Sequence, residues 1–357
     1  MTNGISPGAQ GRSEDERVVV AAIGGEESAF ASISERHRRE LQVHCYRMLG
    51  SLQDAEDAVQ EAFLRAWRSR ESFTYRGPSS FRAWLYRVAT NACLDVLQRK
   101  PRKLFPWQPG SAGDGPRGSL LPPDRDLAWL QPYPDESLEG IAPDEERPDA
   151  QVVARETIEL AFIVAIQLLS PTQRAVLILR DVLGWSAKET AALLDTTVAA
   201  ANSALQRARA TLKQHLPERR VEWAAPSEPT ADEVALVRRY MEAHERGDFA
   251  AMAELLHEDA RLTMPPTPSW FDGRDAIAAL FASWLDPQSP GYVGEVRRVP
   301  VGANGQPGSA GYLRRPGDSA YRPLGLEFLR IENGKVAELT MFVSTDLFPA
   351  FALPETL

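Results

Sequence analysis

Residues 184–212 read GWSAKETAALLDTTVAAANSALQRARATL, inside a stretch from Ser170 to Leu216 that has the pattern of a helix-turn-helix. Gly184 is placed to end one helix, because glycine accepts the backbone conformation found at helix C-termini. Ser186 and Glu189 have the spacing of a capping box, which predicts the start of the next helix. A polar turn over residues 195–197 then precedes a third helix.

This third helix has an apolar face and a polar face. Apolar residues recur at steps of three and four, which predicts burial of Val198, Ala201, Leu205, Ala208 and Leu212. The outward residues are Thr197 at the helix start, then Asn202, Ser203, Gln206, Arg207 and Arg209. In a DNA-binding helix-turn-helix, such side chains read bases and hold phosphates, and Asn202, Ser203 and Gln206 are the candidate readers. An ordinary helical hairpin with a solvated polar face would show the same pattern.

Length and charge limit the kind of protein. With 357 residues, of which 43% are hydrophobic, the chain predicts two or three domains with sizeable cores. Its formal net charge of -9 argues against a protein that coats nucleic acid indiscriminately. Contacts with DNA would therefore come from local basic patches, such as residues 99–103 (RKPRK).

Cysteines and apolar runs exclude further classes. Cys45 and Cys93 lie in apolar helical patterns, so neither a disulfide framework nor a cysteine-rich zinc site is expected. His44, next to Cys45, would point in a different direction on a helix, and we expect no metal or other cofactor. No apolar run approaches the roughly 18 residues of a membrane span, and the acidic N-terminus lacks a signal peptide, so we expect a cytoplasmic protein.

Changes in composition divide the chain into segments. We expect a disordered tail (1–25), a helical domain (26–103), a proline-rich acidic linker (104–149), a second helical domain with the helix-turn-helix (150–218), a short linker (219–229), a third domain (230–345) and a C-terminal tail (346–357). Prolines break helices and central strands, so the first linker is extended. Its residues 128–134 (AWLQPYP) are aromatic enough to predict a docking segment or a linker that packs on its own domain, and we expect the apolar tail 347–354 to dock as well.

The third domain combines helices and strands. Residues 230–249 predict an amphipathic helix, and a second helix follows Asp272 and ends near Trp284. Strand patterns cover residues 296–301, 310–314, 324–331 and 336–343, with a hairpin turn at Asn333-Gly334. We expect helices followed by an antiparallel curved sheet.

The first domain contains a helix with two different faces. Ala58, Val59, Ala62, Phe63, Ala66 and Trp67 form its apolar stripe, whereas Asp54, Glu56, Asp57, Gln60 and Glu61 cluster on the other sides. The next helix exposes Arg82, Arg87 and Asn91.

The loop between these two helices, residues 71–78 (ESFTYRGP), mixes aromatic residues with arginine. Such a surface suits single-stranded nucleic acid, because aromatic contacts hold each unstacked base with about 1 to 3 kcal/mol while arginines hold the backbone. An alternative is that Phe73 and Tyr75 only cap the core of the bundle.

At these motifs the chain resembles the bacterial extracytoplasmic-function sigma factors, the specificity subunits of RNA polymerase. The resemblance rests on residues 54–67 (DAEDAVQEAFLRAW), 81–91 (FRAWLYRVATN) and 169–174 (LSPTQR) with the helix-turn-helix. It implies that Asp54, Glu56, Asp57, Gln60 and Glu61 bind core polymerase, whose clamp helices and flap would be the docking elements. It further implies that the melted minus-ten element contacts Phe73, Tyr75, Arg76, Arg82, Trp84, Arg87 and Asn91, and that the helix beginning at Val198 reads the minus-thirty-five element.

The chain departs from this family in two places. Ala199, Ala200, Ala201 and Ala204 dilute a recognition helix that is usually more basic, and the linker is longer than usual. The C-terminal extension resembles the SnoaL-like cone domains of the nuclear-transport-factor-like fold through residues 259–266 (DARLTMPP) and 271–274 (FDGR). The implied fold is two all-α sigma domains followed by an α+β cone.

Some cone domains are enzymes, so His257, Asp259, Asp272 and Asp346 are candidates for proton transfer. Asp272 is equally suited to a local turn and His257 to a helix C-terminus, so we expect no catalysis. Trp270, Trp284, Tyr312, Phe328 and Phe342 are expected mostly to fill the core. We expect the cone to be a regulatory domain that packs on the sigma modules or the linker. Its partner could be an anti-sigma factor or a small ligand. A stand-alone helix-turn-helix regulator and a bifunctional enzyme are the alternatives.

Overall fold

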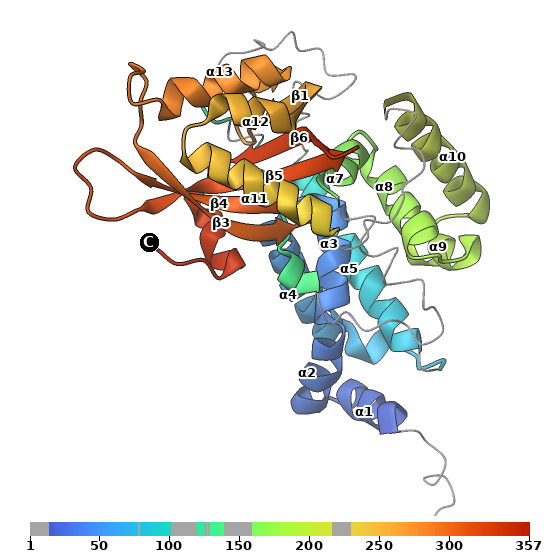
Figure 1. The fold of residues 1–357 in the computed structure, drawn as a ribbon. Coiled ribbons are helices and arrows are strands. Elements are labelled where there is room, and N and C mark those ends of the chain that lie inside the picture. Colours follow the sequence, from blue (N-terminus) through green and yellow to red (C-terminus); the bar gives the residue numbers. More distant parts are fainter. Residues whose placement is uncertain are drawn as a thin grey trace, which may run out of the picture. The chain divides into compact units, whose positions relative to one another are not determined.

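The computed structural model describes residues 14–77, 79–100, 120–124, 127, 129–138, 159–215 and 230–357 (Figure 1). Contacts within the chain group it into two compact units. Unit 1 comprises Met1–Pro101 and Pro171–Leu205, and unit 2 comprises Arg102–Ser170 and Gln206–Leu357.

Unit 1 begins with a bundle of helices. They are α1 (Glu14–Ile23), α2 (Glu27–Arg36), α3 (Arg38–Leu49), α4 (Leu52–Ser69) and α5 (Ser79–Arg99), with the short 3₁₀ turn η1 (Arg70–Ser72) after α4. Helix α1 lies in the segment expected to be a disordered tail, and for residues 14–23 that expectation is wrong. Val19 and Ala22 of α1 are buried, so apolar packing stabilises this short helix.

The helix with two faces is α4. The Ser51 side chain caps it by accepting from the Asp54 amide at 3.1 Å. Ala55, Ala58, Val59, Ala62 and Ala66 are buried, as the periodicity predicts, whereas Phe63 and Trp67 remain half-buried.

The helix-turn-helix is formed by α8 (Pro171–Leu177), the π-helical turn η4 (Ile178–Val182), α9 (Ala187–Leu193) and α10 (Val198–His215). Gly184 has φ 65°, and Ser186 and Glu189 form the predicted capping box. The apolar face of α10 is confirmed at Ala201, Leu205, Ala208 and Leu212. Val198 is an exception with 43% exposure, because it stands at the first position of the helix, before the turn that packs.

Within unit 1, α8 packs against the bundle. Nη1 of the buried Arg174 donates to the Met48 carbonyl at 2.6 Å, where α3 approaches its end. The ring of Trp185, just before α9, lies 5.5 Å from that of Tyr86 on α5. A further helix, α7 (Leu160–Ile166), belongs to unit 2.

The third domain is a sheet covered by helices. The helices are α11 (Ala231–Glu245), α12 (Phe249–Leu255) and α13 (Arg274–Leu285). The strands are β1 (Leu256–Thr263), β2 (Trp270–Asp272), β3 (Glu295–Ala303), β4 (Gln306–Arg314), β5 (Arg322–Glu332) and β6 (Lys335–Phe342), in the spatial order β2-β1-β6-β5-β4-β3. The four strands expected from the sequence are present, and Asn333 (φ 51°) and Gly334 (φ 71°) form the predicted turn between β5 and β6.

The expectation of a purely antiparallel sheet is wrong, because β1 pairs with β6 in parallel. Strand β1 was not predicted, since it begins directly after α12 and its residues 257–259 (HED) are exposed and poor strand formers. A register shift between Leu256 and Arg261 also interrupts the alternation that identifies a strand.

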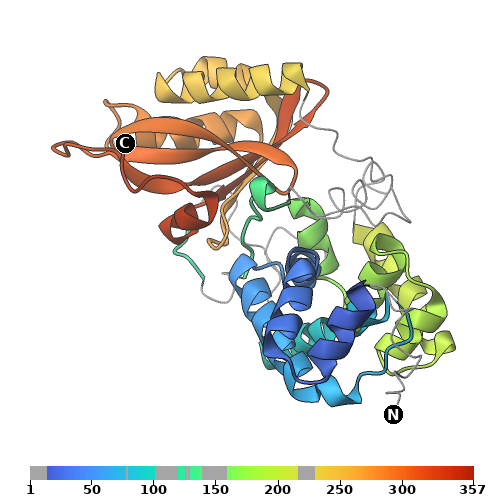
Figure 2. The same cartoon turned by 90° about the horizontal axis from the view of Figure 1, so that it is seen from below.

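Helices cover part of each face of the sheet. Figure 2 shows α11 (yellow) on one side of the sheet and the short helix η6 (Thr345–Phe351, dark red) on the other. Leu262, Leu329, Leu339 and Met341 belong to the core with the helices, whereas Phe351 of η6 stacks on Phe328 at 6.0 Å.

The C-terminal tail docks as predicted. The Tyr312 hydroxyl donates to the Pro354 carbonyl at 2.8 Å, and the backbones of Tyr321 and Leu357 exchange hydrogen bonds of 3.0 and 3.1 Å. Tyr312, Phe328 and Phe342 are therefore packed side chains, covered in part by the tail, as expected for core residues.

Candidate nucleic-acid interface

The acidic surface of α4 is mostly open to solvent. Glu56, Asp57 and Gln60 are exposed, while Asp54 and Glu61 are half-buried. Asp54 lies in the first turn of α4, where a negative charge is favoured by the helix dipole. Nε2 of Gln42 on α3 donates to Glu56 at 3.2 Å. One helix thus presents at least three exposed polar or acidic side chains together.

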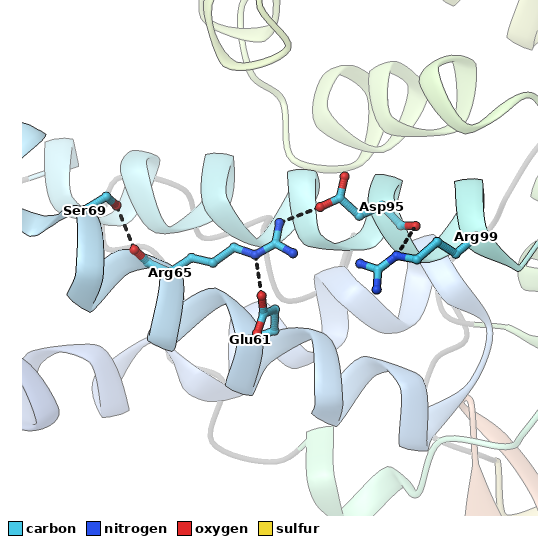
Figure 3. A network of polar contacts seen from close by, with 5 residues as sticks. All are labelled: Glu61, Arg65, Ser69, Asp95 and Arg99. Carbon is cyan, nitrogen blue, oxygen red and sulfur yellow. Dashed lines mark hydrogen bonds and ion pairs between the residues drawn. The ribbon is translucent and has the colours of Figure 1, made fainter.

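Glu61 has a structural contact that the sequence pattern did not suggest. Nε of Arg65 donates to Glu61 at 2.6 Å, and Nη1 of Arg65 donates to Asp95 on α5 at 2.6 Å (Figure 3). Nε of Arg99 donates to the Asp95 carbonyl at 3.3 Å. Glu61 therefore takes part in a bridge between α4 and α5 as well as in the acidic surface.

The aromatic residues after α4 pack on one another. The ring of Phe73 lies 5.8 Å from that of Phe81 and 5.1 Å from that of Trp84. Phe73, Tyr75 and Trp84 are half-buried, so each keeps part of its surface accessible. Phe73 thus caps the bundle core, as the alternative interpretation holds, and its accessible part leaves room for a base contact.

The polar residues on α5 and in the loop before it differ in their environment. Arg76, Arg87 and Asn91 are exposed. Arg82 is half-buried, and its Nε donates to Glu40 on α3 at 2.7 Å. Its guanidinium also lies 5.0 Å from the centroid of the Tyr86 ring.

Glu40 was missed by the sequence reading. It accepts from the Tyr86 hydroxyl at 3.1 Å and pairs with Nδ1 of His37 at 2.5 Å. Burial by itself would raise the pKa of Glu40, but hydrogen bonds and charge from His37 and Arg82 hold that pKa below its ordinary value. No local pattern joins Glu40 to Arg82, because the pair forms only when α3 packs against α5.

The polar face of α10 is accessible. Asn202, Gln206, Arg207 and Arg209 are exposed, and Ser203 is half-buried. Thr197 is exposed and caps α10, since its hydroxyl accepts from the Ala200 amide at 3.1 Å. The sequence-predicted reading face therefore lies along one side of a single helix.

The linker segment docks on the cone, as the aromatic stretch predicts. Leu127, Trp129, Leu130 and Tyr133 are buried. The Tyr133 amide donates to Oδ1 of Asn304 at 2.7 Å, and the Asn304 amide donates back to the Tyr133 carbonyl at 2.9 Å.

Further contacts hold both ends of this docked segment. Asp135 accepts from the Gly305 amide at 2.8 Å, and the Leu121 amide donates to the Ser269 hydroxyl at 2.8 Å. The remaining expectations for the linker concern residues 101–119 and 139–150, which lie outside the described residues.

Three of the four candidates for proton transfer are exposed, and the fourth is in an ion pair. His257 and Asp259 are exposed on β1, and Asp346 is exposed at the start of η6. Asp272 pairs with Arg261 across β1 and β2 at 2.6 Å. His257 lies on a strand, so its suggested role at a helix C-terminus is wrong.

A different polar cluster lies inside the cone. Nη1 of Arg298 donates to Glu327 at 2.6 Å and to the Ser309 hydroxyl at 3.0 Å, and both members of the ion pair have 2% side-chain exposure. The Tyr240 hydroxyl donates to Glu327 at 3.1 Å. Burial, followed by the Glu327 charge, raises the pKa of Tyr240, so its hydroxyl stays protonated. No sequence signal indicated this cluster, because its members come from four separate elements.

His44 and Cys45 are buried side chains of α3. Burial and the nearby Arg47 charge lower the pKa of His44 to about 3, and its Nε2 lies 2.9 Å from the Thr90 hydroxyl. Cys45 is a free thiol. Among the described residues, no group of His, Cys, Asp and Glu side chains could hold a metal ion, and none of the helices there has the length and apolar character needed to span a membrane.

Three family models match separate parts of the chain. Sigma-70 region 2 matches residues 33–103, Sigma-70 region 4 matches residues 159–212, and the SnoaL-like domain matches residues 237–339. The first match contains α4 and α5, and the second contains α8, α9 and most of α10.

Relatives share this arrangement over almost the whole chain. ECF RNA polymerase sigma factor SigG of Mycobacterium tuberculosis is 42% identical over 92% of this chain and 85% of its own length. SigJ of the same species is 28% identical over 90% of this chain and 94% of its own. The crystal structure of SigJ superposes with a TM-score of 0.57 and covers 91% of this chain and 99% of SigJ. The chain therefore belongs to the ECF RNA polymerase sigma factors, with a SnoaL-like domain at its C-terminal end.

Proposed function

We propose that this sigma factor directs core RNA polymerase, in the cytoplasm, to a subset of promoters and assists their melting. The observation that carries the proposal is the presence, in one chain, of the exposed acidic face of α4 and the exposed polar face of α10. The acidic face, Asp54, Glu56, Asp57, Gln60 and Glu61, would dock on the clamp helices of the polymerase. Charged surfaces of this kind steer association and select the correct partner.

The surface around α5 would bind the melted minus-ten strand. The half-buried rings of Phe73, Tyr75 and Trp84 offer edges and faces to unstacked bases, and the exposed Arg76, Arg87 and Asn91 can contact the backbone. Arg82, which is held by Glu40, would meet the strand from a fixed position.

The exposed face of α10 would read the minus-thirty-five element in the major groove. Asn202 and Gln206 carry amide groups that suit base edges, and Arg207 and Arg209 suit guanine or phosphate. Ser203 and Thr197 flank this face near the start of the helix.

The cone would regulate these surfaces without covalent chemistry. The docked linker segment supports this regulatory role. Residues 120–138 lie between region 2 and region 4 in the chain, and they are hydrogen-bonded to the cone at Ser269, Asn304 and Gly305. By holding this segment, the cone limits the positions that the two sigma regions can adopt.

Two other functions make different predictions. A stand-alone helix-turn-helix regulator would have no use for the acidic face of α4. A bifunctional enzyme would show turnover of a small molecule that is lost on changing Asp259 or Asp272.

Run-off transcription on a promoter library tests the proposal. Purified core polymerase is combined with the full chain or with a version that ends near Arg220. Promoter-specific transcripts are expected, and the difference between the two versions gives the sign of control by the cone. If neither version binds core polymerase or supports initiation, the stand-alone regulator becomes the better account; equal output and equal core affinity would remove the regulatory role of the cone.

A further inference from the structure

Val198 is an apolar side chain that stays 43% exposed at the first position of α10. The two residues after it, Ala199 and Ala200, are exposed as well. The first turn of the helix proposed to read the minus-thirty-five element therefore presents methyl groups to its surroundings and carries no charge.

This first turn is held in a fixed position. The Thr197 hydroxyl accepts from the Ala200 amide at 3.1 Å, and the Thr197 carbonyl accepts from the Ala201 amide at 2.9 Å. The Thr196 amide donates to the Ala191 carbonyl at 2.9 Å, which ties the turn to α9. Ala201 is buried, so the first turn of α10 is also anchored by packing. Val198 is thus presented from an ordered segment.

Val198 lies on the same side of α10 as two candidate base readers. Residues four positions apart share one face of a helix, and Val198, Asn202 and Gln206 follow one another at this step. Asn202 and Gln206 are exposed. Val198 therefore extends the reading face by one turn toward the start of the helix, and a DNA duplex that covers Asn202 and Gln206 would meet Val198 too.

The chemistry of the major groove limits what Val198 can contact there. The N-terminal residues of a recognition helix approach base edges. These edges carry hydrogen-bond donors and acceptors, except that thymine also presents its C5-methyl group. A valine side chain neither donates nor accepts, so it cannot satisfy a phosphate or a polar base edge. The thymine methyl group is the feature of the groove that suits it.

We propose that Val198 reads a thymine of the minus-thirty-five element by packing its side chain against the C5-methyl group of that base. The inference rests on the proposed function and names the base chemistry that the first turn of α10 selects. Burial of one methyl group predicts an about fourfold preference for thymine over the same base without its methyl group.

Replacement of single thymidines by deoxyuridine tests this contact, because deoxyuridine lacks only the C5-methyl group. Holoenzyme, formed from the full chain and core polymerase, is bound to promoter duplexes that carry the minus-thirty-five element preferred in the run-off library. Each thymidine of the element is replaced in turn on either strand. At one position the affinity should fall about fourfold, whereas replacements outside the element should leave it unchanged.

Val198→Ala should abolish this preference, so that the variant binds the thymidine and deoxyuridine duplexes equally well. Alanine is a strong helix former and the position is exposed, so the fold of α10 should be unchanged. Val234→Ala is the matched control, since it makes the same truncation at a valine with 46% exposure on α11 of the cone. This control should keep the about fourfold preference.

The possible failures are distinguishable. If the holoenzyme prefers one minus-thirty-five sequence but no deoxyuridine replacement lowers its affinity, promoter recognition stands and the inference is overturned. A preference that persists in Val198→Ala also overturns it, because another residue would then contact the methyl group. If the holoenzyme does not form or shows no preference at the minus-thirty-five element, the proposed function fails and the inference fails with it.

Discussion

Nε of Arg82 donates to Oε2 of Glu40 at 2.7 Å, so a residue proposed to contact DNA is paired with a carboxylate 42 positions earlier in the chain. The same oxygen accepts from the Tyr86 hydroxyl, and the other carboxylate oxygen meets His37. This arrangement joins α3 to α5 and sets the direction of Arg82. It makes Glu40 important for the stability of the region 2 bundle and for the position of a residue proposed to contact DNA.

Stability of this bundle should fall in acid because of Glu40. Its pKa is lowered from 4.5, so its stabilising contribution is present above that value and is lost as the pH falls through the lowered pKa. Glu40→Gln should destabilise α3 and α5 by about 2 kcal/mol at neutral pH, since a charged hydrogen-bond acceptor is replaced by a neutral one. Hydrogen exchange of α3 and α5 peptides, compared between variant and parent from pH 7 down to below 4, measures this. A difference that stays constant with pH would show that the carboxylate charge is not responsible.

Core polymerase binding should depend on the acidic face of α4. Asp57 is exposed, so Asp57→Lys should leave the fold unchanged and weaken binding to core polymerase at least about tenfold by placing a like charge at the interface. Asp275→Lys on α13 is the control, because it makes the same change of charge at a side chain with 96% exposure. Fluorescence anisotropy with labelled sigma factor gives both affinities. Equal losses in the two variants would mean that only net charge matters.

The sequence predicted the local structure well where one pattern dominates. The Ser186–Glu189 capping box, the alternating strands and the Asn333-Gly334 turn all depend on neighbouring residues, and each is confirmed. Strand β1 was not predicted, because its parallel partner β6 lies about 80 residues later in the chain and a register shift interrupts its own alternation. Helix α1 was not predicted, because the packing of Val19 and Ala22 stabilises it and the composition of the N-terminal segment does not indicate a helix.

The proposed binding surfaces also divide into features that the sequence predicts and features that depend on packing. The faces of α4 and α10 follow from helical periodicity, so their exposed residues could be listed from the sequence. Pairs such as Arg82 with Glu40, or Arg298 with Glu327, depend on which elements pack together, and no spacing rule within a single element identifies them. The docking of the linker could be predicted, because aromatic residues in a proline-rich segment are expected to pack against another part of the protein. Its hydrogen-bond partner Asn304 could not be predicted.

Promoter reading should weaken on replacing Arg207→Gln. The side chain is exposed on α10, and a lost base contact would cost about 1 to 3 kcal/mol on the preferred minus-thirty-five sequence. Gln214→Ala, at an exposed position near the end of α10, is the control. Electrophoretic mobility shifts with a specific and a scrambled duplex measure sequence-specific and non-specific affinity separately. Equal weakening on both duplexes would identify a phosphate contact instead of a base contact.

Linker docking should depend on the side chain of Asn304. Its φ of 58° is accessible to glycine, so Asn304→Gly removes the acceptor of the Tyr133 amide without straining the backbone. The Tyr133 amide would then lose its hydrogen bond to this side chain, which costs about 1 to 3 kcal/mol. Hydrogen exchange of residues 129–138 should increase. Asn333→Gly, at φ 51° in an exposed turn, is the matched control and should leave this segment protected.

The transcriptional effect of Asn304→Gly tests whether docking is the means of control. If the cone acts by holding the linker, this variant should shift run-off output in the same direction as removal of the cone. A linker that is released without any change in output would show that the cone acts through another contact.

Removing one partner of the buried pair of Arg298 and Glu327 should lower the stability of the cone strongly. Replacing both partners with apolar residues should lower it much less. Glu327→Leu leaves the guanidinium buried without its partner, which should destabilise the cone by about 3 to 5 kcal/mol. Adding Arg298→Met removes the unpaired charge as well, so the double variant should regain much of that loss, because desolvation offsets most of the attraction within a buried pair. Hydrogen exchange of β4 and β5 in the single and double variants compares the two costs. A double variant that is no more stable than Glu327→Leu would contradict this reasoning and assign the stabilisation to the hydrogen bonds with Tyr240 and Ser309 instead of the ion pair.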